Sequence, residues 1–169
     1  MRYPHKALEE RPMNYLPIAI KLKNRRAVVI GGGKVAERKI FTLLDAGADV
    51  YVVSPKATSN VRRLAKKGDI RWFRRSIVRS DVRNAQIIIS ATDNRDVNRY
   101  VRRCAREFHI PVNVVDDSRI SDFISPALLR FKKLIIAVYT DGKDPVLSRD
   151  LKNYLKENWD DFISYRSGL

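Results

Sequence analysis

Short apolar runs alternate with amphipathic stretches along most of this chain. The runs are each long enough for a buried strand and cover residues 27–30, 50–53, 70–73, 86–91 and 112–115. Between the first two, Ala36, Ile40, Leu43 and Leu44 recur at the spacing of one helix face, and Gly47 is suited to end that helix. Strands that alternate with helices predict an α/β fold with a doubly wound parallel sheet.

Two further helices follow from the same kind of pattern. A short one is expected over residues 61–67. A longer one follows the capping residues Asp93 and Asn94, and its apolar face carries Val97, Tyr100, Val101, Cys104, Ala105 and Phe108. Both lie between expected strands, as the crossover helices of a parallel sheet should.

The pattern changes after Asp117. Residues 123–129 and 134–140 are joined by a basic turn with no room for a crossover helix, which predicts an antiparallel hairpin. Asp144 and Pro145 then start a last helix, with a face made of Leu147, Leu151, Tyr154 and Leu155. We therefore expect an extension over residues 1–12, a sheet domain over 13–117, and a segment over 118–169 that dimerises or covers a ligand.

The first strand runs directly into Gly31, Gly32 and Gly33, and a helical pattern follows at once. The spacing Gly31-x-Gly33-x-x-Ala36 is the dinucleotide-binding form with alanine in the third place. Glycines allow a tight turn and a close approach to a pyrophosphate, and the new helix directs its unpaired N–H groups at the phosphates. The loop and its flanks predict a Rossmann-type dinucleotide site.

Composition narrows the choice of partner. The chain has 169 residues and a net charge of +15, which indicates affinity for an anionic ligand or is simply a solvated basic surface. Nucleic acid is disfavoured because no helix-turn-helix, zinc or aromatic RNA-binding motif is present.

No apolar run approaches the ~20 residues that span a bilayer, so we expect no membrane partner. A single cysteine, Cys104, favours a reducing cytoplasm.

The residues that could catalyse a reaction are carboxylates and hydroxyls. His5 and His109 are far apart in the sequence, Cys104 is the single cysteine, and no spacing typical of metal ligands is present. Ligands bind at the carboxyl ends of strands in open α/β sheets. The second strand is followed by Ser54, Pro55 and Lys56, without the acidic residue that usually holds a ribose. The ribose would then be bound by backbone groups or by Ser54. A cofactor with a 2′-phosphate, bound near Lys56, is not excluded.

The fourth and fifth strands also end in polar residues. Thr92 and Asp93 follow the fourth, where helix capping and cofactor binding are equal alternatives. Asn113 lies in the fifth strand and Asp116 follows it. The Asp116 carboxylate either accepts a proton beside the cofactor or is an ordinary loop carboxylate.

Several ordered motifs together resemble the precorrin-2 dehydrogenase family, the NAD-dependent module of sirohaem synthesis. They are residues 16–18, 31–39, 91–93, 113–116, 123–127, 137–140, Gly142 and 145–147, within a match from Met13 to about Lys156. The resemblance implies oxidation of precorrin-2 to sirohydrochlorin, with hydride passing to NAD. It assigns the catalytic carboxylate to Asp116, and some members also insert ferrous iron with the same aspartate implicated.

The resemblance further implies cofactor contacts at Lys34, Val35, Pro55, Lys56, Thr92 and Asp93, beside the three glycines. It implies a homodimer built through the segment from Ser118 onward. Precorrin-2 carries eight carboxylates, so a basic cleft would balance it. Substrate candidates are Asn113, Arg119 and Thr140, with Arg130, Lys132, Lys133 and Lys143 as further cations.

Two departures from the family stand out. Members commonly continue into a helical C-terminal region that helps form the tetrapyrrole site, and we expect that region to be short or missing here. Some members carry a regulatory serine near residues 139–143, where this chain has Thr140 between Tyr139 and Asp141.

Two other functions compete with the enzyme. An NAD-sensing regulatory module would need the glycine loop but no catalytic Asp116. A nucleic-acid binder would use the basic surface and lose affinity steeply with salt.

Overall fold

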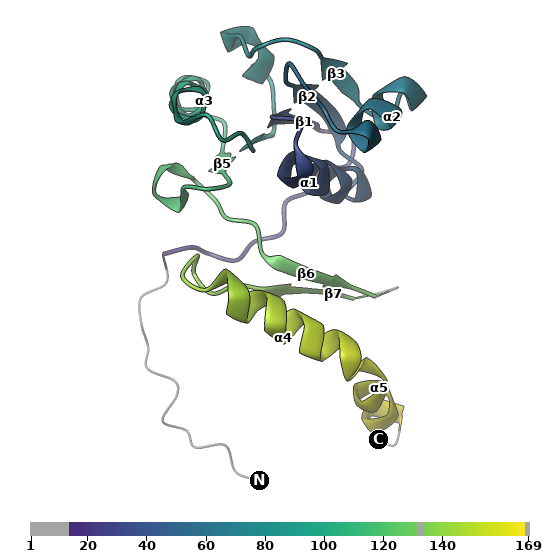
Figure 1. Ribbon diagram of the computed structural model, residues 1–169. Helices are drawn as coiled ribbons and strands as arrows, with labels where there is room; N and C mark the ends of the chain where they lie inside the picture. The colour runs from purple at the N-terminus through teal and green to yellow at the C-terminus, as the bar shows by residue number, and fades with distance from the viewer. Residues whose placement is uncertain (1–13, 132–133, 168–169) are drawn as a thin grey trace. The chain divides into compact units, whose positions relative to one another are not determined.

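A computed structural model describes residues 14–131 and 134–167 (Figure 1). Within that range the chain forms two compact units, which we describe separately. The sheet unit covers residues 19–125, and the hairpin–helix unit comprises residues 14–18 with 126–167. The division falls after Ser125 rather than after Asp117, and the expected extension over residues 1–12 lies outside the described residues.

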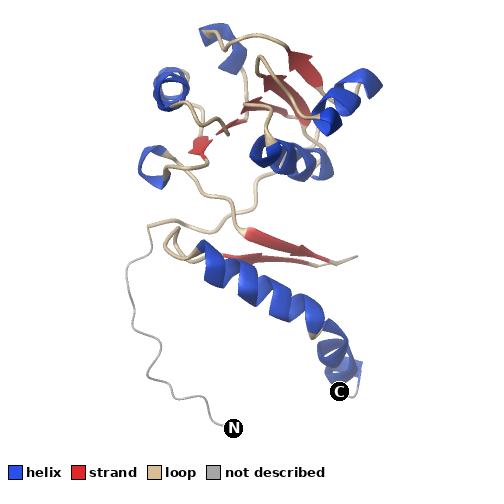
Figure 2. Ribbon diagram, in the orientation of Figure 1, coloured by secondary structure: helices blue, strands red, loops and turns tan. Residues whose placement is uncertain are grey.

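The sheet unit holds five parallel strands in the order β3-β2-β1-β4-β5. The strands are β1 (Arg26–Ile30), β2 (Asp49–Val53), β3 (Arg71–Phe73), β4 (Ile87–Ser90) and β5 (Val112–Val114). The crossovers contain α1 (Lys34–Asp45), α2 (Ser59–Lys67), the 3₁₀ turn η2 (Arg79–Val82) and α3 (Arg95–Glu107), and the 3₁₀ turn η3 (Ser118–Ile120) follows β5. Figure 2 shows these strands and helices by type.

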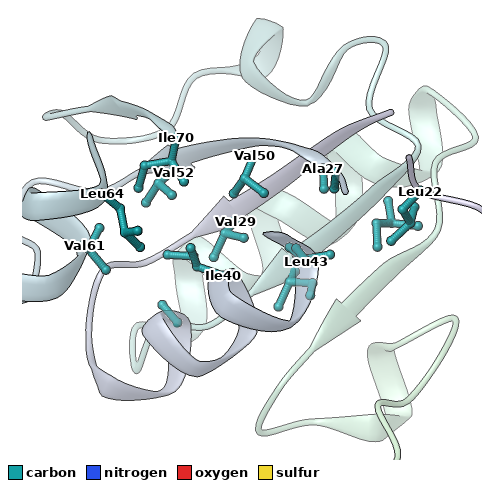
Figure 3. Close-up of a cluster of buried hydrophobic side chains, with 14 residues drawn as sticks. Leu22, Ala27, Val29, Ile40, Leu43, Val50, Val52, Val61, Leu64 and Ile70 are labelled. Carbon is teal, nitrogen blue, oxygen red and sulfur yellow. The ribbon is translucent and has the colours of Figure 1, made fainter. Parts of the chain in front are cut away.

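Each face of the sheet has its own apolar core. Val29 and its neighbours pack against α1 and α2, as in the cluster of Figure 3 that contains Ile40 and Val61. Val28, one residue away, packs in a second cluster with Val101 of α3. Side chains alternate between the faces of a strand, so strands covered on both faces are apolar throughout. The predicted α/β doubly wound sheet is confirmed.

Residues at the helix ends confirm two boundaries that were predicted from the local sequence. Gly47 follows the C-cap Ala46 of α1 with φ +73°, the left-handed conformation that ends many helices. The Asn94 side chain caps α3 and accepts from the backbone N–H groups of Asp96 and Val97 at 2.9 and 3.1 Å. The capping role therefore belongs to Asn94.

The hairpin–helix unit contains β6 (Ala127–Arg130), β7 (Ile135–Val138), α4 (Pro145–Glu157) and α5 (Trp159–Ser167). The hairpin is antiparallel as predicted, and α4 runs along it (Figure 1). Its first strand starts later than expected, because Phe123 packs in the core of the sheet unit. Asp144 caps α4 by accepting from the N–H of Leu147 at 2.8 Å, as the sequence predicted.

The apolar face predicted for α4 is largely exposed. Ser148 is the buried residue of α4, with Leu155 half-buried, whereas Leu147, Leu151 and Tyr154 are exposed. Helical spacing fixes which residues share a face but not which face meets its own hairpin. The exposed apolar stripe of α4 therefore lacks a covering element among the described residues.

Candidate active site

The carboxyl ends of four strands meet in register at one edge of the sheet. Ile30 lies opposite both Val53 and Ser90, and Ser90 lies opposite Val114. Backbone hydrogen bonds continue past the strands, from Gly31 N to Val53 O at 3.0 Å, from Ala91 N to Ile30 O at 2.8 Å, and from Val115 N to Ser90 O at 3.0 Å. The polar segments predicted to form the site thus leave the sheet side by side.

Gly31 and Gly32 are required by the protein's own backbone. Gly31 has φ +113°, and a Cβ there would lie 2.1 Å from the carbonyl oxygen of Ala91. A Cβ on Gly32 would lie 2.3 Å from the carbonyl oxygen of Lys56. Any side chain at either position would displace a neighbouring loop. These two glycines bring the loops after β1, β2 and β4 together.

Gly33 has a different role, because a Cβ there would meet no atom within 4 Å. It is the N-cap of α1 and provides no side-chain cap, so the first-turn N–H groups of the helix keep their hydrogen-bonding capacity. Lys34 and Val35 are exposed beside it. An uncapped helix start with a lysine in its first turn fits a pyrophosphate.

The loop after β2 is held by side chains that the sequence analysis did not single out. Glu37 of α1 accepts hydrogen bonds from the Thr58 hydroxyl and, at 2.8 Å, from the amide of Asn60. These bonds hold the pKa of Glu37 below its ordinary value. Thr58 N also donates to Gly32 O at 2.9 Å. The signal in the sequence was Glu37 itself. A carboxylate in the first turn of a helix that binds an anion needs hydrogen-bond donors from elsewhere in the protein.

Ser54 is buried, whereas Pro55 and Lys56 are exposed. The indole N–H of Trp72 lies 3.0 Å from Ser54 O and 3.2 Å from Ser54 Oγ, so it donates to one or shares the two. The expected ribose contact at Ser54 therefore competes with an internal partner. Lys56 is the charged residue that the loop leaves open to a ligand.

Thr92 and Asp93 lie where β4 meets α3. The hydroxyl of Thr92 accepts from Asn94 N at 3.3 Å, and its carbonyl accepts from the amide of Asn98 at 3.0 Å. Asn98 is buried and also accepts from the Ser90 hydroxyl at 2.7 Å. This network fixes the loop backbone and leaves the Asp93 side chain exposed. A buried asparagine on an otherwise apolar helix face was the available sequence signal.

Asp116 and Asp117 follow β5, and the structure separates their roles. Asp117 accepts from Arg119 through Nε at 2.9 Å and Nη2 at 3.0 Å, and these bonds hold its pKa below the ordinary value. Asp116 is exposed, and no described side chain forms an ion pair or hydrogen bond with its carboxylate. Asp116 is therefore a carboxylate at this edge that is available to a substrate, as is the exposed Asp93 after β4.

The remaining substrate candidates have internal partners. Asn113 is buried and its amide donates to Phe123 O at 2.9 Å, which ties the segment after β5 to the strand. Arg119 is bound to Asp117. Thr140 lies in the hairpin–helix unit, where its hydroxyl lies 2.7 Å from Asp144 O and 3.1 Å from Ser148 Oγ. Lys132 and Lys133 lie outside the described residues.

A family model described as putative NAD(P)-binding matches residues 18–127, which include every element of this edge. The chain belongs to this family. The predicted cofactor is thereby confirmed as a nicotinamide dinucleotide, and the glycine loop with the uncapped start of α1 fits its pyrophosphate.

Two curated relatives are siroheme synthases. Siroheme synthase 3 of Aeromonas hydrophila is 40% identical and siroheme synthase of Methylococcus capsulatus is 42% identical, each over 144 residues. The alignments cover 85% of this chain but 31% and 30% of the relatives, so the chain spans about a third of their length. A solved structure, SirC, precorrin-2 dehydrogenase, has a TM-score of 0.76 at 29% identity, covering 85% of this chain and 71% of that one. The resemblance to the precorrin-2 dehydrogenase family is confirmed.

The described residues show no group of three or more His, Cys, Asp or Glu side chains that could hold a metal ion. Within the same residues, no helix combines the length and apolar character needed to cross a bilayer.

Proposed function

We propose that this protein oxidises precorrin-2 to sirohydrochlorin with NAD as the hydride acceptor. The observation that carries the proposal is the exposed, unpaired carboxylate of Asp116 at the same sheet edge as the open start of α1. Adjacent strands are ~4.8 Å apart, and β5 is two strands from β1. Asp116 therefore lies on the order of 10 Å from the glycine loop along the edge, within the length of a dinucleotide. The siroheme synthase and dehydrogenase relatives support the same reaction.

The reaction removes a hydride and a proton from the macrocycle. When bound, NAD would be the hydride acceptor. The first-turn N–H groups of α1 and the Lys34 ammonium bind and orient the pyrophosphate. Asp116 accepts the proton through a carboxylate oxygen, because Asp117 is already engaged by Arg119.

The choice of NAD over NADP is part of the proposal. Ser54 and Lys56 occupy the loop where an acidic residue often binds the ribose hydroxyls, so the sequence does not exclude a 2′-phosphate there. The name of the relative SirC refers to a dehydrogenase without specifying the cofactor. Parallel titrations of NAD and NADP, with Lys56→Ala as the variant, assign the preference.

The net charge of +15 supports a polycarboxylate substrate. Arg119 is the substrate candidate with the most accessible side chain, at 87% exposed, and it would exchange Asp117 for a substrate carboxylate. Asn113 would contribute by holding the segment after β5 rather than by direct contact, and Thr140 holds the start of α4 within its own unit.

We further propose a homodimer in the cytoplasm. The exposed stripe of Leu147, Leu151 and Tyr154 on α4 and the exposed Ile135 of β7 are the apolar surface that a second copy would cover. The single cysteine, Cys104, is buried and free, which suits a reducing compartment.

The decisive experiment follows the absorbance of sirohydrochlorin and NADH with precorrin-2 as the substrate. We expect Asp116→Asn to lower kcat by on the order of 10²–10⁴ while the Kd for NAD changes less than about twofold. Asp117→Asn is the matched control and should keep most of the turnover, because its carboxylate already has a partner. Equal turnover by Asp116→Asn and the wild type would exclude the assigned role. NAD binding without turnover by the wild type would exclude the reaction.

A further inference from the structure

A cavity of about 500 Å³ opens at the opposite edge of the same sheet. It is lined by the connections that precede β1, β4 and β5, namely residues 24–26, 83–86 and 108–110. The proposed active site lies at the carboxyl ends of these strands, and the cavity at their amino ends. Strands of three to five residues separate the two edges by roughly 10–17 Å, so a ligand here would not contact the glycine loop.

The lining of the cavity is strongly basic. Arg25, Arg26, Arg83 and His109 contribute to it, and none of the described lining residues is acidic. The neighbouring carboxylate of Asp81 is fully used: it accepts from Arg75 Nη1 and Nη2 at 2.7 and 2.6 Å and from Val78 N at 2.8 Å. The charge of Asp81 is therefore matched by Arg75, and Asp49, which lies opposite Arg26 in β2, forms no ion pair with the cavity's arginines among the described residues.

Arg26 is held in place, and one of its buried donors has no partner. Its Nη2 donates to Asp81 O at 2.9 Å, and its guanidinium lies 4.1 Å from the centre of the Tyr51 ring. Its Nε is buried and has no hydrogen-bond partner. A buried donor without a partner costs about 1–3 kcal/mol, so a site that supplies an acceptor would stabilise the guanidinium.

The connections that line the cavity are tied to the rest of the fold by backbone hydrogen bonds. Asn24, Asn84 and His109, one in each lining connection, have φ of 58°, 62° and 54°. Backbone bonds join these connections to the fold, including Asn24 N to Gly47 O at 2.8 Å and Gln86 N to Arg26 O at 2.7 Å. The site would therefore need little reorganisation to bind a ligand.

The cations are not needed to cap the helix that ends beside them. The last-turn carbonyls of α3 at Cys104, Ala105 and Arg106 already accept from the backbone N–H groups of Phe108, Ile110 and His109 at 3.1, 2.9 and 3.1 Å. The negative end of a helix amounts to about half a unit charge, which is less than the full charges of three arginines. The net field in the cavity favours an anion.

We propose that this cavity binds a small ligand that carries two neighbouring phosphate groups. Guanidinium groups bind phosphate oxygens in pairs, and phosphates satisfy several donors in one small volume. Arg25 and Arg83 are exposed at the rim, where Arg83 lies over the Phe108 ring at 5.6 Å, and Arg26 lies deeper. The site is separate from the proposed reaction and does not depend on it.

Inorganic pyrophosphate is the probe, titrated calorimetrically into the full chain in the presence of saturating NAD. Saturation with NAD matters because the glycine loop could itself bind pyrophosphate. We expect a Kd below 1 mM at low salt, and Arg25→Gln and Arg83→Gln should each weaken binding at least fivefold while NAD affinity stays unchanged. Both residues are exposed, so both variants should melt as the wild type does.

Arg74→Gln is the matched control, since Arg74 is an exposed arginine outside the cavity and the substitution removes the same charge. It should weaken pyrophosphate binding less than twofold. Equal weakening by Arg74→Gln would show a diffuse charge effect and overturn the site. Absence of binding by the wild type, or citrate binding as tightly as pyrophosphate, would overturn the phosphate assignment. An RNA oligonucleotide that binds where pyrophosphate does not would also overturn it.

Discussion

The two units of this chain use the same apolar residue types in opposite ways. In the sheet unit, Val28, Val29 and Ile88 are completely buried. In the hairpin–helix unit, Ile135 is 64% exposed and Leu147 is 55% exposed. One unit forms its own core, and the other presents an apolar surface.

The difference is consistent with the place that we propose for the chemistry. A rigid site needs residues whose positions are fixed by packing, and the two cores of the sheet unit hold the strand ends that carry the glycine loop and Asp116. The described residues of the hairpin–helix unit bury one large apolar side chain, Leu129. Such a unit buries little apolar surface by itself, which is why we propose that a second copy covers it.

The largest effect we predict follows from this contrast. Ile88→Ala leaves a cavity between the sheet and α3 and should lower the free energy of unfolding by about 2–5 kcal/mol. Leu151→Ala, on the exposed face of α4, should cost less than about 1 kcal/mol when measured on the monomer at low protein concentration. Urea unfolding of both variants tests the contrast, and similar losses would mean that the second unit has a core of its own.

The sequence was sufficient for features that depend on neighbouring residues. The strand runs, the Asp144 cap and the Gly47 helix end were predicted because each depends on local sequence alone. The edge at which polar loops meet also followed, since parallel strands place their carboxyl ends together.

The rest depended on tertiary contacts that no local pattern contains. The indole of Trp72 is an internal hydrogen-bond partner of Ser54, the residue predicted at a ribose, and their distance in sequence gave no warning of it. The amide of Asn113, a predicted substrate residue, likewise donates to Phe123 O. What covers the apolar face of α4 could not be predicted for the same reason, because an amphipathic pattern does not distinguish an intramolecular partner from a second subunit.

A second prediction tests whether a second copy covers the stripe on α4. Leu147→Glu should raise the dimer Kd at least tenfold, about 1.4 kcal/mol, by placing a charge in an apolar interface. The helix itself should tolerate the change, because an acidic residue three positions after the Asp144 cap favours a helix start. Sedimentation over a range of concentrations measures the effect.

Phe41→Glu is the control for that experiment, since Phe41 is an exposed apolar residue on α1 in the sheet unit. It should leave the dimer Kd unchanged. If Phe41→Glu dissociates the protein and Leu147→Glu does not, the second subunit binds the sheet unit instead.

The smallest predicted effect is on the pH dependence of stability, and it is tested on one carboxylate from each unit. Burial alone would raise the pKa of Asp81, but the bonds from Arg75 and Val78 hold it below the ordinary value. Burial likewise opposes the bonds from Lys143 and Asn14 that lower the pKa of Asp141. A lowered native pKa stabilises the fold above the unfolded pKa of about 4, and that stabilisation disappears as the pH falls through the native value.

Asp81→Asn should therefore be less stable than the wild type by about 1 kcal/mol between pH 5 and 8, and the gap should close below about pH 4. Asp141→Asn should show the same sign with a smaller gap, because its partners are exposed and asparagine tolerates the φ of 55° at that position. Thermal unfolding across this pH range measures both gaps. If the stability difference between variant and wild type widens on acidification, the pKa of that aspartate in the folded protein is raised rather than lowered. A larger stability difference for Asp141→Asn than for Asp81→Asn would show that the hairpin–helix unit limits the stability of the chain.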